Sequence, residues 1–472
     1  MRGFIVCIVV MVISGSALAE NWPQWRGPRG NGVSIETGLP VKWGDEENVA
    51  WTAQLSGLSV STPIIHGDRV FVTGQAGRGV LREGNHPTLM RGEETPSERS
   101  LGALGALGAS GASGALGEAA SADEGAVTFL VEAFDRVSGR RLWQYRTPAE
   151  TAAGGELPPV HRKHNLASPS PVTDGERVYA WFGTGQLVAL DLEGKLVWQK
   201  HVAKDYAPFE IPWGHSSSPT VYEDVLLLLC DHEPASYLLA LDKRTGQEKW
   251  KTDRGKGLRS YSTPTVVSGP AGDELVVNSS EKLEGYDPKT GKPLWFLVEP
   301  NQFPIPVPSF ANGIIYTSRG YRSGPYMAIR PGARGDLKGS EHLLWHVPTG
   351  APYVSSVVHY QGVIYMASDA GVVQAVDAAT GERLYQGRTG GVFSAAPVAG
   401  DGKIYFMSET GEAIVIAAKR EFEILAQNPM KARFLASPAI SGGQIFLRSD
   451  DRLIAIGKPT EPTTSGPFDE QR

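Results

Sequence analysis

The chain has 472 residues and a net charge of −6 at neutral pH. An acidic chain lacks the positive field that nucleic-acid binding requires, so we expect no nucleic-acid partner. The length exceeds that of a usual single domain, although a repeat architecture absorbs it in one unit. Partners are therefore expected among proteins and small molecules.

The first residues predict a secretory leader. Arg2 precedes an apolar stretch at residues 4–13, and Ala17-Leu18-Ala19 follows it. This order matches a cleavable signal peptide, and the apolar stretch is too short to span a membrane. We expect a signal peptide at 1–19 and an exported protein, periplasmic or extracellular, that is soluble and has no transmembrane anchor.

The two cysteines add to this interpretation. Cys7 lies inside the apolar stretch and not at the cleavage point, which argues against a lipid anchor. Cys230 would be alone after cleavage, so no disulfide can form within the mature chain. Because it ends the apolar run 225–229, a buried, inert thiol is expected, with a reactive thiol as the alternative.

A repeated segment dominates the chain from there on. Its clearest copy runs from Ala240 through Asp242, Thr245 and Gly246 to Trp250. The units start at Pro63, Pro169, Pro219, Pro264, Pro308, Ser356, Pro397 and Pro438. From the second start onward the intervals are 50, 45, 44, 48, 41 and 41 residues, which is the period of a four-stranded propeller blade.

The recurring Asp-x-x-Thr-Gly is a turn signal. Asp and Thr side chains accept hydrogen bonds from the following amides, and Gly takes the positive φ of a tight hairpin. An aromatic residue closes most units and is expected to pack between neighbouring blades. The tryptophans assigned to this structural role are Trp51, Trp143, Trp198, Trp250, Trp295 and Trp345.

We therefore predict an all-β fold, a single eight-bladed β-propeller over residues 20–457. The last unit supplies three strands, so the N-terminal segment 48–55 is expected to complete blade eight and close the ring, which removes exposed sheet edges. Residues 74–125 are predicted to form a low-complexity, disordered insertion in blade one. Residues 458–472 are predicted to be a disordered tail.

These residues resemble a known family. The Ala-x-Asp-x-x-Thr-Gly-x-x-x-Trp unit is similar to the tryptophan-docking repeat of the pyrroloquinoline quinone (PQQ) propellers, which include quinoprotein alcohol dehydrogenases and the outer-membrane assembly lipoprotein BamB. The opening Asn21-Trp22-Pro23-Gln24-Trp25-Arg26-Gly27-Pro28 resembles the start of exported bacterial PQQ-like repeat proteins. The resemblance covers residues 21–457. It is specific for fold and weak for function, because this fold carries both catalysts and scaffolds.

Any site is expected on one face of the ring. The turns within the repeats are short on one side, whereas the connections on the other side are long, and function concentrates on such loops. Polar and aromatic residues gather just before the inner strands on this long-loop face. The predicted ligand-binding residues are His164, Asn165, His215, Arg259, Tyr261 and Arg319. For the two histidines, structural hydrogen bonding is the alternative.

Two functions remain open. The BamB resemblance implies a non-catalytic scaffold that binds an envelope protein or a small molecule, with no catalytic residues, no metal and no cofactor. The dehydrogenase resemblance implies a PQQ-dependent oxidoreductase for alcohols or sugars, with PQQ and Ca²⁺. The chain has no adjacent cysteines and no Cys-x-x-Cys-His haem motif, and we find no convincing calcium-ligand set. His161-Arg-Lys-His164 is weak as a zinc motif. We therefore favour the scaffold.

Overall fold

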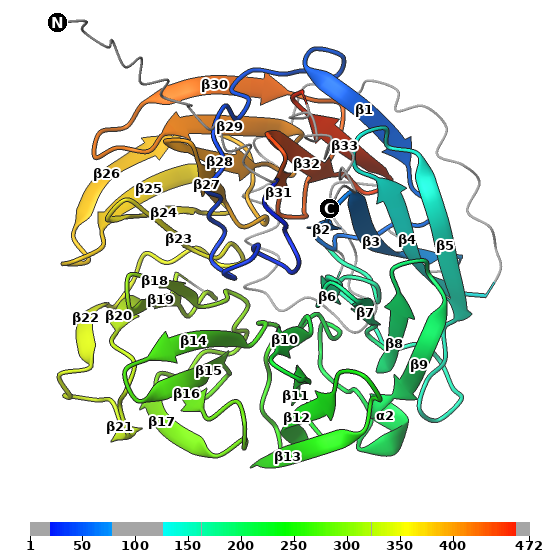
Figure 1. Ribbon diagram of the computed structural model, residues 1–472. Coiled ribbons are helices and arrows are strands. Elements are labelled where there is room, and N and C mark those ends of the chain that lie inside the picture. The colour runs from blue at the N-terminus through cyan, green and yellow to red at the C-terminus, as the bar shows by residue number, and fades with distance from the viewer. Residues whose placement is uncertain (1–18, 78–125, 162, 322, 459–472) are drawn as a thin grey trace, which may run out of the picture.

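The computed structural model describes residues 19–77, 126–161, 163–321 and 323–458. Eight antiparallel sheets surround a central axis, so the predicted eight-bladed propeller is confirmed (Figure 1). Each unit's first strand lies innermost and its last strand outermost. None of the helical segments in these ranges has the length and hydropathy that crossing a membrane requires.

Blades one to four follow the chain order. Blade one has β2 (Ile64–His66), β3 (Arg69–Ala76), β4 (Thr128–Asp135) and β5 (Arg141–Pro148). Blade two has β6 (Val172–Thr173), β7 (Arg177–Trp181), β8 (Gln186–Asp191) and β9 (Leu196–His201), followed by the short helix α2 (Val202–Asp205). Blade three has β10 (Thr220–Tyr222), β11 (Val225–Asp231), β12 (Ser236–Asp242) and β13 (Glu248–Gly255). Blade four has β14 (Thr265–Gly269), β15 (Gly272–Asn278), β16 (Lys282–Tyr286) and β17 (Pro293–Val298).

Blades five to eight complete the ring. Blade five has β18 (Ser309–Ala311), β19 (Ile314–Ser318), β20 (Tyr326–Ile329) and β22 (Leu343–Val347), and β21 (Gly335–Asp336) pairs with blade four. Blade six has β23 (Val358–Tyr360), β24 (Val363–Ala367), β25 (Val372–Asp377) and β26 (Arg383–Arg388). Blade seven has β27 (Val398–Gly400), β28 (Lys403–Met407), β29 (Glu412–Ala417) and β30 (Ile424–Pro429). Blade eight has β31 (Ala439–Ser441), β32 (Gln444–Arg448), β33 (Arg452–Ile456) and β1 (Val49–Gln54).

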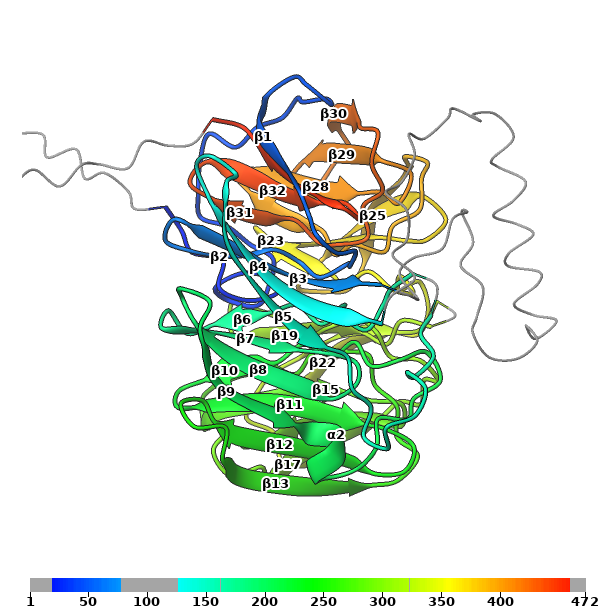
Figure 2. The same cartoon turned by 90° about the vertical axis from the view of Figure 1, so that its right-hand side faces the viewer.

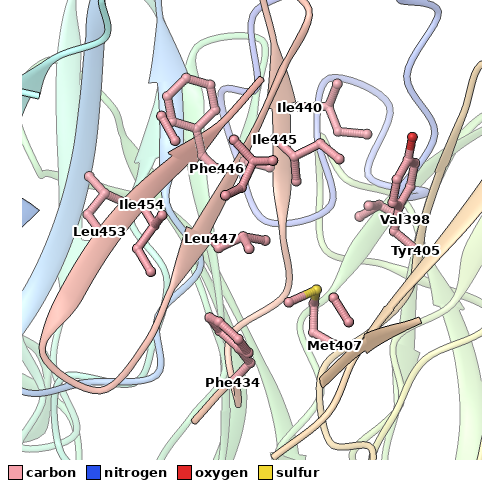
Figure 3. Close-up of a cluster of buried hydrophobic side chains, with 14 of the residues drawn as sticks. Val398, Tyr405, Met407, Phe434, Ile440, Ile445, Phe446, Leu447, Leu453 and Ile454 are labelled. Atoms are coloured by element: carbon pink, nitrogen blue, oxygen red, sulfur yellow. The ribbon is translucent and has the colours of Figure 1, made fainter. Parts of the chain in front are cut away.

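Blade eight shows how the ring closes. Strand β1 pairs antiparallel with β33 and places Trp51 opposite Ala455, so the N-terminal strand is the outermost strand of the last blade. Side chains on both faces of blade eight belong to one continuous apolar cluster, which includes Tyr405 and Met407 of blade seven, Phe446 of blade eight and residues of blade one (Figure 3). Closure therefore joins the chain ends through both main-chain pairing and buried apolar area.

Neighbouring blades are joined at the outer edge by tryptophan. The indole Nε1 of Trp143 donates to the carbonyl of Leu192 at 2.8 Å, and that of Trp198 donates to Lys243 at 3.1 Å. Trp51 and Trp345 make the same bond to blades one and six. In each pair the next blade's turn glycine lies against the indole ring, where a Cβ would clash. The turn glycine is thus required twice, for its positive φ and for this close approach.

A second set of bonds joins the blades at the inner edge. At five junctions a hydroxyl at the start of one unit, or next to that start, accepts a main-chain N–H from the preceding blade. The pairs are Thr62 to Ser170 at 2.9 Å, Ser170 to Ser218 at 2.9 Å, Ser218 to Thr263 at 3.0 Å, Val307 to Ser356 at 2.9 Å and Ala396 to Ser437 at 3.0 Å. These bonds give a structural reason for the Ser and Thr residues at these unit starts.

The segment before β1 lies across the ring on the short-turn face (Figures 1 and 2). Trp22 exchanges two main-chain hydrogen bonds with Ile65 of blade one, and Pro23 accepts from Thr173 of blade two. Arg26 is buried and donates to the carbonyl of Val357 in blade six, while Ser34 donates to Ala399 in blade seven. The N-terminal segment therefore covers the axis on this side.

Two predicted boundaries need comment. Residues 74–76 belong to β3, so the insertion in blade one begins later than predicted, because these residues continue the ladder with β4. The remainder of the predicted insertion, the predicted leader up to residue 18 and the tail from residue 459 lie outside the described residues. Cys230 is buried in β11, and burial raises the pKa of its thiol far above the ordinary range, as expected for an inert cysteine.

Candidate functional site

The long-loop face carries the connections between blades and the turns between each second and third strand. The longest described connection, residues 149–171, leads from blade one to blade two and crosses part of this face. The six predicted ligand-binding residues all lie on this side of the ring, but they do not form one site. Five are buried or tied into the framework, and only Arg259 presents its charged group at the surface.

His215 is part of a buried histidine pair. Its Nδ1 lies 3.1 Å from Nε2 of His232, and its Nε2 lies 3.1 Å from the carbonyl of Ser217. The ring packs 4.2 Å from Trp181 and 5.0 Å from Phe209, centroid to centroid. Desolvation lowers the pKa of His215 to about 3, so the imidazole is neutral at physiological pH. This geometry matches the structural alternative.

His164 and Asn165 tie the start of blade two to its neighbours. Nε2 of His164 lies 2.6 Å from the carbonyl of Trp213, and burial lowers the pKa of this imidazole. The amide of Asn165 donates to the carbonyl of Leu58 at 2.7 Å and accepts from Ala167 at 3.0 Å. The hydrogen bonds of both side chains are thus made to backbone atoms.

Arg319 lies inside the blade four to blade five junction and is fully buried. Its guanidinium donates to the side chain of Asn278 and to the carbonyl of Ser279. Desolvation lowers its pKa to about 10, although the charges of nearby glutamates, Glu299 first, oppose this shift. Arg319 therefore cannot meet a ligand at the surface without leaving this position.

Arg259 lines a shallow hollow at the surface. The hollow has a volume of about 290 Å³ and lies between blades three, four and five, with Ser280, Glu281 and Asn301 in its wall. Nη2 of Arg259 is 2.7 Å from a carboxylate oxygen of Glu233, and both side chains are partly exposed. The hollow is polar and open, so it is more suited to a protruding side chain than to an enclosed small molecule.

Beside this hollow lies an aromatic cluster, formed by Trp213, Tyr261, Phe303, Tyr321 and Tyr353. Phe303 is central: its ring centroid is 4.9 Å from that of Tyr321 and 5.8 Å from that of Trp213. Tyr321 continues the chain of contacts to Tyr353 at 5.1 Å. Tyr261 and Phe303 are buried, whereas Trp213, Tyr321 and Tyr353 stay partly exposed.

The sequence analysis missed two of the five aromatic residues of this cluster. Trp213, Tyr261 and Tyr353 stand out before inner strands, but Phe303 and Tyr321 do not, because one lies in a proline-rich linker and the other in a turn. Only the blade geometry brings the four linkers and the turn together. A signal was present in the spacing, since Trp213, Tyr261, Phe303 and Tyr353 each precede their inner strand by a few residues.

A charged cluster lies on the opposite side of the same face. Nζ of Lys163, from the connection between blades one and two, is 2.6 Å from Glu409 of blade seven, and Ser394 donates to the same carboxylate. Asp369 of blade six lies nearby. Burial raises its pKa to about 6, with the charge of Glu409 adding to the shift and that of Lys163 opposing it. The salt bridge anchors the crossing connection to blade seven.

The donor chemistry does not suit a calcium ion. Among the described residues, no three His, Cys, Asp or Glu side chains come together as a metal site, and this includes the His161 and His164 pair. Two carboxylates on this face are paired with cations: Asp231 with Arg254 at 2.9 Å and Asp450 with Arg433 at 2.8 Å. Ca²⁺ requires six to eight oxygen ligands. Among the described residues, clustered His, Cys, Asp and Glu side chains do not supply such a set.

Comparison with known proteins agrees with the fold. The family described as outer membrane protein assembly factor BamB matches residues 127–302, 337–418 and 369–460. The chain is 26% identical over 313 residues to a tetrathionate hydrolase from Acidithiobacillus ferrooxidans, covering 61% of this chain and 56% of that protein. The chain thus spans little more than half the length of this curated relative.

Two solved structures share the architecture. BamB from Moraxella catarrhalis superposes with a TM-score of 0.52 at 14% identity, over 69% of this chain and 90% of that one. The quinohemoprotein alcohol dehydrogenase from Comamonas testosteroni gives a TM-score of 0.60 at 11% identity, over 94% of this chain and 82% of that one. At these identities the likeness concerns the fold alone.

Proposed function

Because the chain belongs to the BamB family of PQQ-like propellers, we propose that it is an exported, non-catalytic scaffold whose aromatic cluster docks an envelope protein. The observation that carries the proposal is the cluster itself. Three of its aromatic side chains remain partly exposed on a rigid ring, where buried aromatic neighbours hold them in place. Tryptophan and tyrosine in such settings contribute most of the binding energy of protein interfaces.

The surroundings of the cluster support a protein partner. The exposed Arg259–Glu233 pair and the polar hollow adjoin the cluster and provide the polar rim that interfaces use around an apolar centre. The hollow is too open to enclose a small molecule, whereas it could receive one side chain of a docked segment. The partner should therefore present an apolar side chain flanked by polar groups.

Replacement of Trp213 by alanine tests this proposal. Purified wild-type protein, immobilised on beads, should capture one protein from envelope extracts, and crosslinking should identify residues near the cluster as the contact. Trp213→Ala should reduce capture at least tenfold, as loss of an aromatic anchor does. Trp25→Ala is the matched control, because Trp25 is a partly exposed tryptophan on the opposite face. Equal capture by both variants, with unchanged melting temperatures, would contradict the docking face.

The oxidoreductase alternative is tested separately. PQQ with Ca²⁺ would supply two-electron oxidation of an alcohol or sugar, but the described carboxylates do not form the ligand set that holds such a pair. Addition of PQQ and Ca²⁺ should leave the melting temperature unchanged. A rise in melting temperature together with substrate-dependent dye reduction would replace the scaffold proposal by the oxidoreductase.

A further inference from the structure

The main-chain nitrogen of Glu20 is held by a carboxylate. It lies 2.7 Å from Oε1 of Glu36. The same carboxylate accepts the N–H groups of Gly442, at 2.7 Å, and of Gly443. These two glycines form the turn between β31 and β32, and both have positive φ, +61° and +73°. Successive amides in such a turn create a small pocket for an anionic group, and Glu36 fills it.

The side chain of Glu20 is held as firmly as its nitrogen. Its Oε2 accepts from the hydroxyl of Ser34 at 2.8 Å and from the N–H of Ile35 at 3.1 Å. Its Oε1 pairs with Arg29 at 3.0 Å, and the side chain is only 10% exposed. Residue 20 is thus built into the framework although it directly follows the predicted leader.

We propose that removal of the leader after Ala19 creates an ion pair between the new α-ammonium of Glu20 and the carboxylate of Glu36. This ion pair, called the latch below, fixes the N-terminal segment to blade eight. The inference rests on the proposed export. The export peptidase hydrolyses the bond between Ala19 and Glu20: the oxygen of one water becomes an oxygen of the Ala19 carboxylate, and both its protons pass to the Glu20 nitrogen, which becomes an α-ammonium. One neutral N–H donor becomes a cation with three donors, so its bond to the carboxylate becomes charge-assisted.

The surrounding charges favour this cation. The groups that face it are the carboxylates of Glu36 and Glu20, with Arg29 neutralising the second, and Arg136 of blade one approaches the Gly442 turn from the other side. The carboxylate of Glu36 is held by neutral amides and has no cation of its own in the described contacts. The α-ammonium supplies that charge. The latch contacts the β31–β32 turn of blade eight, the blade that β1 completes. The latch and the β1–β33 pairing therefore both attach the N-terminal segment to blade eight.

The contribution of the latch to stability depends on pH. A free α-amine has a pKa of about 7.7–8.0, and the pairing with Glu36 raises it in the folded state. A raised folded pKa contributes stability that is complete below about pH 7.7 and is lost as the pH rises through the folded value. An N-terminal extension keeps a neutral amide at Glu20 and should lack this loss.

Two chain starts and one substitution test the latch. We compare a chain that begins at Glu20 with one that begins at Leu18, each with Glu36 or with Glu36→Gln, and measure melting temperature and proteolytic release of the N-terminal segment from pH 7 to 10. Release from the chain beginning at Glu20 should increase about tenfold across this range, which corresponds to a pKa raised by one unit. The longer chain and both Glu36→Gln chains should stay flat.

The outcomes separate the latch from the proposed function. Identical pH profiles for the two chain starts would overturn the latch, as would an exported protein whose mass places its first residue elsewhere than Glu20. Neither result touches the Trp213 capture test, which concerns the other face. Conversely, loss of partner capture by the Trp25→Ala control as well would contradict the docking face and leave the latch standing.

Discussion

The junction between blades two and three and the junction between blades four and five use the same residue type differently. Trp198 reaches outward to the next blade, lies against Gly246 of its turn and donates to Lys243 at 3.1 Å. Trp295, at the equivalent repeat position, is buried at 2% exposure and donates within its own blade to Glu274 at 2.8 Å. The cause lies in blade five, which lacks the Asp-x-x-Thr-Gly turn and sends β21 to pair with β17 instead.

The structural role of the repeat tryptophan therefore depends on the segment that the next blade places against it. Where the next blade offers a glycine turn, the tryptophan forms an inter-blade joint and, except for the buried Trp51, stays half-buried. Where the turn is replaced by a longer segment, Leu337 and Ala333 cover the indole and it becomes core. Replacement of each tryptophan should therefore lower the free energy of unfolding by a different amount, and four measurements test the difference between the two junctions.

The largest effect is expected for Trp295→Ala. Removing a fully buried indole leaves a cavity and takes the donor from the buried Glu274, so the free energy of unfolding should fall by about 3–5 kcal/mol. Chemical denaturation measures it, with Trp198→Ala as the comparison, which should cost clearly less because that indole is half-buried. A larger loss for Trp198→Ala would reverse our interpretation of the two junctions.

The second effect is acid sensitivity at the junction of blades two and three. His215 has a folded pKa of about 3 against about 6.5 when unfolded, so stability is lost as the pH falls below 6.5. This residue alone should cost about 2 kcal/mol by pH 5. Denaturation at pH 7 and pH 5 measures the loss. His215→Phe should flatten the profile, and an unchanged slope would show that the histidine pair does not control it.

The third effect separates the two roles of the turn glycine. Gly246 has φ of +71°, and an added Cβ would lie 2.8 Å from Trp198, whereas Gly313 has φ of +75° with open space around it. Gly313→Ala should cost about 1 kcal/mol from backbone strain alone. Gly246→Ala should cost about 1–2 kcal/mol more, because the indole must move. If the two variants lose equal amounts of unfolding free energy, the contact with the indole adds nothing to the requirement for glycine at position 246.

The smallest effect is the indole hydrogen bond. Trp250 lies against Gly291 as Trp198 lies against Gly246, but its Nε1 has no hydrogen-bond partner among the described residues. Trp198→Phe should therefore cost about 1 kcal/mol more than Trp250→Phe, the usual contribution of one such bond. Chemical denaturation of the two variants in parallel checks the difference, and equal costs would mean that packing alone joins these blades.

At the candidate site, the sequence indicated which residues lie near the inner strands but not which of them are exposed. Polar and aromatic residues before the inner strands predicted His164 and Tyr261 together, and the structure brings both to Trp213: His164 lies against its carbonyl, and Tyr261 packs in the same cluster. Exposure was not predictable: Arg259 and Arg319 have the same side chain in similar loops, yet one is at the surface and the other is fully buried. Whether a loop arginine faces solvent depends on the neighbouring blade.

The repeat by itself determined the architecture. Turn glycines, apolar strand pairs and a constant period are local properties, and they specify blade number and the closing role of β1 because each blade needs four strands. Tertiary structure alone decided three further features: the inward turn of Trp295, the burial of Arg319 and the meeting of Phe303 with Tyr321. Each depends on residues one or more blades away, and a ring brings such residues together only after it has closed.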